Sequence, residues 1–283
     1  MGASTPQPND NAEISPARRL TRTLAVAAAA AALGAVTAPP AHAARDHYPW
    51  AKRVRAAERY ADTRQGIVSF AVVGEDRKLR GDHVDRPHNS HSVVKAMLLL
   101  AYLRQPDVRH RDLTEADRDL LRPMIRRSDN QTATTVYQRV GAGALYSLAR
   151  EARMKHFSTQ PVWGLTQITA RDQARFFFRI QRLAPDRHRD FAMRLLTEIV
   201  KGQRWGIPPV APRGWTLHFK GGWAPTSSDG GRWGINQVAL LRKAPRRFSL
   251  AILTRYSPSK AYGIRTLRGV ARRLLRGYGR FDG

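Results

Sequence analysis

Apolar and polar positions in the first part of the chain repeat with two spacings, which predict different elements. Residues 48–64 have apolar positions at helical spacing, and residues 66–74 form a β-rich apolar run closed by glycine. Residues 75–82 indicate a turn followed by a second short strand. Helical spacing then dominates residues 112–181 and returns in residues 190–200, so the middle of the chain is predicted to be mostly helical.

The pattern changes again towards the C-terminus. Three apolar runs separated by turn residues predict strands, at residues 215–222, 233–242 and 248–255. A closing amphipathic helix is predicted over residues 257–277. Strands at both ends, with helices between them, predict an α+β fold in which one sheet is built from both ends of the chain and a helical block is inserted between its halves.

Composition adds a strong positive charge to this picture. The chain has 283 residues, 42% of them hydrophobic, which is enough for one substantial core or two modest ones. Lys and Arg total 49 against 22 Asp and Glu, a net charge of +27. This charge fits either an arginine-rich solvated surface or a polyanionic partner, such as a cell wall, a membrane surface or nucleic acid. The absence of cysteine excludes disulfides, zinc–thiolate sites and thiol nucleophiles.

The first 43 residues have the layout of a secretory signal peptide. Three arginines precede an apolar stretch at residues 24–38, and Ala-His-Ala at residues 41–43 supplies a cleavage signal. The stretch ends at two prolines and is shorter than the roughly 18 residues that cross a membrane, so no stable membrane span is expected. We therefore expect a secreted, extracytoplasmic protein that is cleaved near Ala43, with residues 44–283 as its mature domain.

A lysine stands three residues after a serine at the start of the apolar run NSHSVVKAMLLLAYL, residues 89–103. On a helix these positions share a face, so Lys95 would reach back toward the hydroxyl of Ser92. Ser92 would lie in the first helical turn, where unpaired N–H groups favour developing negative charge. A poorly solvated lysine has a lowered pKa and can act as a base, which would activate the serine without a histidine. A lysine that merely snorkels from an apolar helix is the alternative.

Two further motifs follow in order along the chain. Ser-Asp-Asn stands at residues 128–130 between two predicted helices, and Lys-Gly-Gly at residues 220–222 ends a predicted strand. With these motifs and their surroundings, the chain resembles the class A β-lactamases and their relatives, the low-molecular-weight penicillin-binding proteins or serine DD-peptidases. The resemblance implies an antiparallel five-stranded sheet flanked by helices, with an all-helical subdomain inserted at about residues 90–212.

The resemblance also implies a role for each matching residue. Ser92 matches the nucleophile that becomes acylated, and Lys95 matches the lysine that shares a proton with it. Ser128 matches the hydroxyl that relays a proton to the leaving nitrogen. Asn130 matches the amide that holds the substrate and orients the first lysine, and Lys220 matches a second lysine that contributes positive potential.

The substrate side of the resemblance centres on the third motif. The oxyanion hole would be formed by the backbone N–H groups of Ser92 and of Trp223, which directly follows Gly222. Acyl transfer needs such preorganised donors where negative charge develops. The implied substrate is a small acyl compound, either a β-lactam or a peptidoglycan stem peptide, and no metal or organic cofactor is implied. Asp129 is expected to be structural.

Three features depart from the family's pattern. Gly221 stands where a Lys-Thr-Gly motif has a threonine that helps to bind the substrate carboxylate. The deacylating glutamate has no counterpart, since residues 154–170 contain no acidic residue and Asp172 is better explained as a capping-box partner of Thr169. Gln167 can position a water molecule but cannot take its proton, so we expect a slowly hydrolysed acyl-enzyme. The short segment before Ser-Asp-Asn, finally, predicts a more open site.

Several alternatives stay open beside this interpretation. His83, His88 and His91 suggest a metal site, but their spacing fits no helical ligand pair and a solvated loop is the better reading. Tryptophans line a pocket or belong to the core, at positions 163, 205, 223 and 233. A catalytically silent protein that binds wall polymer or a β-lactam is the second hypothesis. Nucleic-acid binding is disfavoured by the export signal, and we expect a monomer with an anionic cell-wall polymer as a candidate partner.

Overall fold

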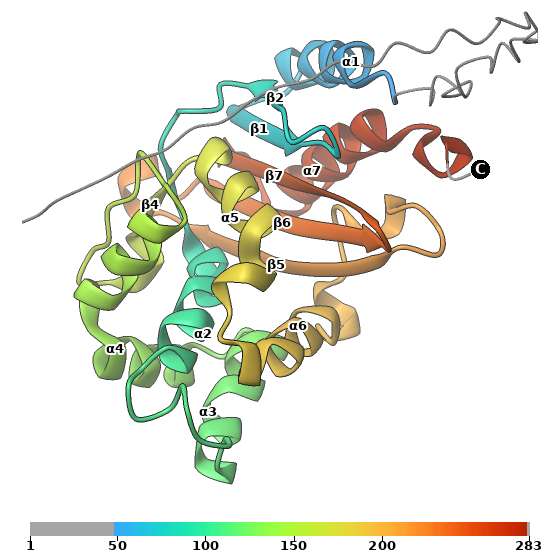
Figure 1. Ribbon diagram of the computed structural model, residues 1–283. Helices are drawn as coiled ribbons and strands as arrows, with labels where there is room; N and C mark the ends of the chain where they lie inside the picture. The colour runs from blue at the N-terminus through green and yellow to red at the C-terminus, as the bar shows by residue number, and fades with distance from the viewer. Residues whose placement is uncertain (1–47, 282–283) are drawn as a thin grey trace, which may run out of the picture. The chain divides into compact units, whose positions relative to one another are not determined.

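An antiparallel five-stranded sheet forms the centre of the fold (Figure 1). The computed structural model describes residues 48–281, so the predicted signal peptide lies outside the described residues. The strand order is β2-β1-β7-β6-β5, and the strands are β1 Ile67–Val73, β2 Leu79–Asp82, β5 Thr216–Pro225, β6 Trp233–Lys243 and β7 Arg246–Ser257. Because β1 pairs with β7 along its whole length, the two ends of the chain share one sheet, as predicted.

Helices cover both faces of this sheet (Figure 1). α1, Trp50–Asp62, packs on α7, Lys260–Leu275, and α7 contacts β6 and β7. α5, Ala170–Leu183, packs against β1, β6 and β7 and buries Phe176 and Phe177 completely. The amphipathic pattern of α7 and the apolar face of α5 therefore have the same cause, which is burial of one helix face on the sheet.

The remaining helices lie between the first and last strands in the sequence, namely α2 Lys95–Leu103, α3 Glu115–Arg126, α4 Asn130–Glu151 and α6 Arg189–Thr197. α2 contacts the other three, and all nine of its residues are buried. An element surrounded on all sides needs apolar residues all round, which explains its unbroken run of leucines. It also makes Lys95, the first residue of α2, an exception that requires a reason.

Two predictions from the pattern were wrong. Helix does not continue almost throughout residues 112–181, because a loop over residues 152–169 separates α4 from α5. This loop holds the short 3₁₀ turn Trp163–Leu165 and strand β4, Gln167–Ile168, which pairs with β3, His88–Asn89. His88 and His91 do not lie in a solvated loop either, since only 1% and 7% of their surfaces are exposed.

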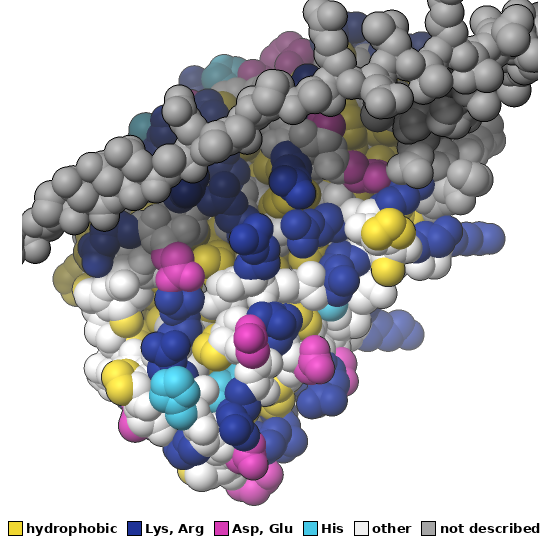
Figure 2. All heavy atoms as spheres, viewed as in Figure 1, with side chains coloured by type: hydrophobic (Ala, Val, Ile, Leu, Met, Phe, Trp, Pro, Cys, Tyr) yellow, Lys and Arg dark blue, Asp and Glu magenta, His cyan; other side chains and the backbone are white. Residues whose placement is uncertain are grey.

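Basic side chains are spread over the surface. Figure 2 shows Lys and Arg side chains across the viewed face with Asp and Glu side chains among them. Ion pairs neutralise part of this charge, for example between Arg171 and Asp85 and between Arg255 and Asp229. In the part of the chain that the structure describes, no helix is long and apolar enough to cross a membrane.

Candidate active site

Ser92 lies where the helical part of the fold meets the edge of the sheet. It belongs to a 3₁₀ turn, His91–Val94, that leads directly into α2, so the predicted first turn is present but is 3₁₀ rather than α-helical. β5 is an edge strand and packs against this turn. Gly222 permits the contact, because a Cβ at this position would lie only 2.7 Å from the Ser92 backbone nitrogen and 2.8 Å from Ser90 O.

The Ser-Asp-Asn segment is the meeting point of two lysines. Lys95 Nζ lies 2.5 Å from Ser128 O, 2.8 Å from Asn130 Oδ1 and 3.3 Å from Ser128 Oγ. Lys220 Nζ donates to Ser128 Oγ at 2.9 Å and to Gly221 O at 3.0 Å. Both lysine side chains are fully buried. The fold therefore brings the three sequence motifs together around one hydroxyl.

Burial changes the protonation of both lysines, because an ammonium group loses its hydration in the interior. Burial lowers the pKa of Lys95 to about 7, against a weaker opposing effect of the Asp129 carboxylate. The pKa of Lys220 is held well below its ordinary value by burial and by repulsion from Lys95. A neutral amine at Lys95 offers two N–H donors, for Ser128 O and Asn130 Oδ1, and keeps one lone pair that can accept a proton.

The pair Ser92 and Lys95 is not yet joined in this state. Within residues 48–281, no hydrogen bond links Ser92 Oγ to Lys95 Nζ, which points into the Ser128 segment instead. Catalytic hydrogen bonds are often long in ligand-free structures and tighten when substrate binds. The geometry thus places the Lys95 amine next to Ser128, with no direct hydrogen bond to Ser92 among the described residues.

Backbone strain marks both sides of the site. His91 and Ser128 have φ angles of 48° and 60°, in the left-handed region that non-glycine residues rarely adopt. Such strain costs on the order of 1–3 kcal/mol and persists where the surrounding structure holds it. Asp129 contributes to that hold by accepting a hydrogen bond from Thr132 N at 2.8 Å, which caps α4 and confirms its predicted structural role.

A cavity of about 460 Å³ opens beside Ser92. Ser92, Asn130 and Trp223 line it together with residues 162–165 of the loop and residues 224–228 at the end of β5. A volume of this size is typical of a small-molecule site. The cavity contains three of the residues that the sequence assigned to catalysis and substrate binding, and it connects them to a loop that the sequence did not.

Trp163, for which the sequence left a pocket and the core as alternatives, lines the cavity from this loop. Its ring centroid lies 4.8 Å from Lys95 Nζ, and its indole N–H donates to Thr134 Oγ1 at 3.1 Å. The loop at residues 152–169 therefore presents an aromatic face to the lysine. The absence of acidic residues from this segment was the signal in the sequence, but it did not indicate what would stand there instead.

The nearest acid after the loop has a different structural role from the one predicted. Thr169 Oγ1 accepts a hydrogen bond from Asp172 N and caps α5, as expected. The Asp172 carboxylate, however, accepts hydrogen bonds from the backbone N–H groups of Lys155 and His156 rather than completing a capping box. It anchors the start of the loop to α5.

Trp205 gives a physical reason for the departure at Gly221. A Cβ at residue 221 would lie 3.0 Å and 3.2 Å from two carbon atoms of the Trp205 indole. The ring thus occupies the space that a threonine side chain would need, and it packs edge to face on Trp223 with centroids 5.6 Å apart. The glycine at residue 221 and the indole of Trp205 therefore fit together, because the ring fills the space beside the glycine.

The three histidines do not form a metal site. His88 Nε2 lies 2.9 Å from Ser69 Oγ in the interior, and His83 bonds to the neighbouring Asp82. His91 lines the cavity beside Ser92, and burial lowers its pKa to about 4. Among the described residues, no group of three His, Cys, Asp or Glu side chains could hold a metal ion.

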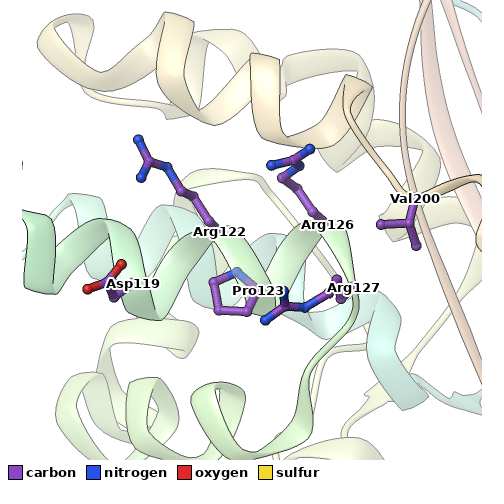
Figure 3. Close-up of a pocket in the computed structure, with 6 residues that line it drawn as sticks. All are labelled: Asp119, Arg122, Pro123, Arg126, Arg127 and Val200. Carbon is purple, nitrogen blue, oxygen red and sulfur yellow. The ribbon is translucent and has the colours of Figure 1, made fainter.

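A second cavity, of about 380 Å³, lies on α3 and does not include Ser92. Figure 3 shows Arg122 and Arg126 pointing to the same side of the helix, with Pro123 between them along the chain. Each of these arginines forms an ion pair, with Glu115 and Glu198 respectively. The positive charge at this second cavity is thus partly compensated by Glu115 and Glu198. The cavity contains none of the three sequence motifs.

Comparison with protein families decides the relationship of the chain. A model described as the beta-lactamase enzyme family matches residues 117–278, more than half of the sequence. The chain belongs to this family. The matched part includes the Ser-Asp-Asn and Lys-Gly-Gly motifs of this β-lactamase family member, whereas Ser92 and Lys95 lie before it. Their assignment therefore depends on the geometry described above.

Solved structures show the same fold at low sequence identity. A β-lactamase from Sphaerobacter thermophilus DSM 20745 superposes with a TM-score of 0.67 at 18% identity, covering 82% of this chain and 98% of that one. The TLA-1 extended-spectrum β-lactamase gives 0.71 at 15%, covering 82% and 100%. A class A β-lactamase from Mycobacterium abscessus gives 0.66 at 19%, covering 80% and 99%. A search of curated protein sequences gave no match. Family and fold together support a serine hydrolase of the β-lactamase type.

Proposed function

We propose that this protein is a serine acyl hydrolase that forms a covalent acyl-Ser92 intermediate with a β-lactam or a cell-wall peptide amide. The observation that carries the proposal is the convergence of Lys95 and Lys220 on Ser128 Oγ, with Asn130 Oδ1 accepting a hydrogen bond from Lys95, beside a cavity that contains Ser92. A structural role alone would not require two fully buried lysines around one hydroxyl, because burying each charge is costly.

In the acylation step, Ser92 Oγ attacks the substrate carbonyl and gives its proton to the lone pair of Lys95. The oxyanion is stabilised by the backbone N–H groups of Ser92 and Trp223. The carbon–nitrogen bond of the substrate then breaks, and the leaving nitrogen takes a proton from Ser128 Oγ. Lys95, 3.3 Å from that oxygen, returns a proton to Ser128, so both groups end as they began.

Release of the acyl group is proposed to be slow. Water must add to the acyl carbon while Ser92 Oγ regains a proton, and this requires a base that removes a proton from the water. The loop at residues 154–169 contains no acid, and the amide nitrogen of Gln167 already donates to Asn89 Oδ1 and Leu165 O. From this loop the indole of Trp163 lies against Lys95, with its ring centroid 4.8 Å from Nζ, and it has no basic group.

A catalytically silent protein that binds wall polymer or a β-lactam is the second candidate. The specific observation in its favour is the missing hydrogen bond between Ser92 Oγ and Lys95 Nζ in the described residues.

Both candidate functions include export of the protein, with cleavage near Ala43 and residues 44–283 as the mature domain. N-terminal sequencing of the protein from the culture medium tests it, because a start other than Ala44 or Arg45 contradicts the cleavage site.

The decisive experiment is intact-mass analysis of the protein with a fluorescent penicillin over time, beside Ser92→Ala. A persistent adduct that needs Ser92 supports the proposal, including slow release. An adduct that disappears while hydrolysed drug accumulates supports the hydrolase and contradicts slow release. An adduct formed equally by Ser92→Ala refutes Ser92 as the nucleophile. If neither β-lactams nor D-alanyl peptides form an adduct, the silent binding protein is the better description.

A further inference from the structure

Helix α7 carries a row of arginines along the side that it turns away from the sheet. Residues three and four positions apart share one side of a helix, and four arginines of α7 and its C-cap have this spacing. They are Arg265, Arg268, Arg272 and Arg276, which we call the arginine row. Arg268 is partly exposed and the other three are exposed. At 1.5 Å per residue, the row extends over about 16 Å of the helix axis.

The arginine row has no acidic counterpart. Residues 257–281 contain no Asp or Glu, and within the described residues 48–281 none of the four arginines forms an ion pair. Exposed arginines elsewhere are paired, for example Arg187 with Asp112. Like charges four residues apart repel one another on a helix. The helix dipole favours the arginines of the last turn, but it does not account for Arg265 and Arg268. The row is therefore an arrangement that an anionic partner would stabilise.

The neighbouring helix extends the positive surface. α1 packs closely on α7 (Figure 1), since a Cβ at Gly269 would lie only 2.2 Å from two carbon atoms of the Tyr60 ring. α1 adds three exposed cations to this two-helix layer, at Lys52, Arg55 and Arg59. Its acidic residues Glu58 and Asp62 form no ion pair with the arginine row in the part of the chain that the structure describes. The layer thus presents positive charge that carboxylates do not neutralise.

The other side chains of the layer indicate which polyanion it fits. Helices that insert into a membrane surface need exposed large apolar side chains, and the three exposed ones among the described residues lie outside α1 and α7, at positions 146, 162 and 165. Sites for single-stranded nucleic acid stack bases on exposed aromatic rings. Here Arg273 covers the Tyr60 ring at 3.8 Å, and Arg64 covers the Tyr262 ring at 4.2 Å. The exposed groups are guanidinium groups, which match phosphate oxygens in geometry and charge.

We propose that the arginine row binds a linear cell-wall polymer of phosphodiester groups, such as a poly(glycerol phosphate). The wall is chosen as the source because of the proposed export of the protein. The position of α7 relates this binding to the site. α7 begins at Lys260, whose Nζ lies 4.8 Å from the ring centroid of Trp223, and Trp223 lines the cavity beside Ser92. A polymer bound along α7 holds the protein on the wall through a helix that starts next to this cavity, and it takes no part in acylation.

Two matched triple variants test where the polymer binds. The row variant removes the exposed cations of the row, with the substitutions Arg265→Gln, Arg272→Gln and Arg276→Gln. The control variant removes exposed arginines that are paired with carboxylates, with the substitutions Arg122→Gln, Arg126→Gln and Arg187→Gln. Both variants lose the same net charge. Binding of fluorescein-labelled poly(glycerol phosphate) is measured by fluorescence anisotropy at about 0.1 M salt. We expect the row variant to bind at least about tenfold more weakly and the control less than about threefold more weakly, because only the row loses phosphate contacts.

The comparison separates a local site from attraction by the net charge of +27. An equal loss in both variants overturns the proposal, because net charge then governs binding. A greater loss in the control moves the site to the cavity on α3, where Arg122 and Arg126 lie. Acylation of Ser92 by a fluorescent penicillin is measured separately and should be the same in the row variant as in the unmodified protein. Failure of the unmodified protein to form this adduct would refute the proposed function without affecting polymer binding.

Nucleic acid and membranes are tested as alternative partners of the arginine row. Oligo(dT) and an abasic oligomer of the same length differ only in their bases, and we expect them to bind with equal affinity. If oligo(dT) binds at least about tenfold more tightly, the surface recognises bases and is a nucleic-acid site rather than a wall-polymer site. Binding to phosphatidylcholine vesicles that contain phosphatidylglycerol, without binding to poly(glycerol phosphate), would assign the row to a membrane surface and overturn the proposal.

Discussion

Replacement of Lys95 by methionine is expected to abolish acylation and to change how stability depends on pH. Lys95 is fully buried, and its pKa falls from 10.5 in its ordinary environment to about 7 in the folded protein. At pH values between about 7 and 10.5, Lys95 carries a proton in the unfolded chain that it has released in the folded protein. The free energy of unfolding therefore rises with pH in this window, and the penalty for burying the lysine is complete below pH 7.

The expected magnitude follows from the size of the shift. One pKa unit corresponds to about 1.4 kcal/mol, so the penalty is about 4 kcal/mol at pH 7 and falls to about 1 kcal/mol at pH 10. Relative to Lys95→Met, the unmodified protein should thus gain about 3 kcal/mol of stability between pH 7 and pH 10. The methionine also leaves Ser128 O and Asn130 Oδ1 without this donor, which shifts the variant's stability by an amount that varies little with pH.

Urea denaturation of both proteins at pH 7, 8, 9 and 10 measures this difference. Other titrating groups contribute nearly equally to both proteins except Lys220, because loss of Lys95 also removes the repulsion that helps to lower the pKa of Lys220. Lys52→Met, which removes an exposed lysine from α1, is the control and should follow the pH dependence of the unmodified protein. A difference between Lys95→Met and the unmodified protein that stays constant across this range would refute the lowered pKa. The lysine would then be a protonated structural cation, and the base assigned to Ser92 would have to be another group.

Three further predictions concern the site itself. The rate of Ser92 acylation by a fluorescent penicillin should rise with pH around a midpoint near 7, because Lys95 must be neutral to accept the proton; a midpoint above pH 9 would contradict this. Gly222→Ala should reduce acylation at least about 100-fold and destabilise the fold by about 1–3 kcal/mol, because its Cβ collides with the Ser92 turn. Gly202→Ala, where nothing lies within 4 Å, should do neither. Trp163→Leu should shorten the lifetime of the acyl adduct in intact-mass experiments, because it removes the ring that covers one side of Lys95 Nζ. An unchanged lifetime would show that the indole does not shield Lys95 from water.

The elements that sequence predicted well are those with a sustained pattern. The three C-terminal strands β5, β6 and β7 are 10, 11 and 12 residues long and contain long apolar runs. Runs of this length leave little doubt that the segments are strands. The pair β3 and β4 has two residues in each strand, too few for any period. It forms because the chain segments are held together elsewhere, as by the hydrogen bond from Ser90 N to Thr166 O at 2.7 Å.

Residues of the candidate site could likewise be predicted where they belong to a local sequence pattern, and not where they depend on contacts between distant parts of the chain. Ser92, Lys95, Ser128 and Lys220 could be assigned to one candidate site because they stand in three short motifs that are visible in the sequence and resemble those of a known family. The positions of Trp163 and Trp205 depend on contacts between residues far apart in the sequence, for example of Trp163 with Lys95 and of Trp205 with Gly221. No local pattern distinguishes such a tryptophan from one in the core. The glycine at residue 221 was a visible departure, but only the structure supplied the ring that it accommodates.

We expect the indole of Trp163 and the missing acid both to slow release of the acyl group from Ser92. In the proposed mechanism Lys95 is neutral again after acylation, and its nitrogen keeps the same neighbours, which are Ser128 O, Asn130 Oδ1 and the Trp163 indole. A cation is stabilised over such a ring, whereas a water molecule gains no hydrogen bond from it. Among the described residues the cavity lining contains no carboxylate, so we expect water in the cavity to meet no carboxylate that could take its proton. We attribute the proposed slow release to this lining together with the indole, so restoring an acid at one position should be less effective than restoring it together with removal of the ring.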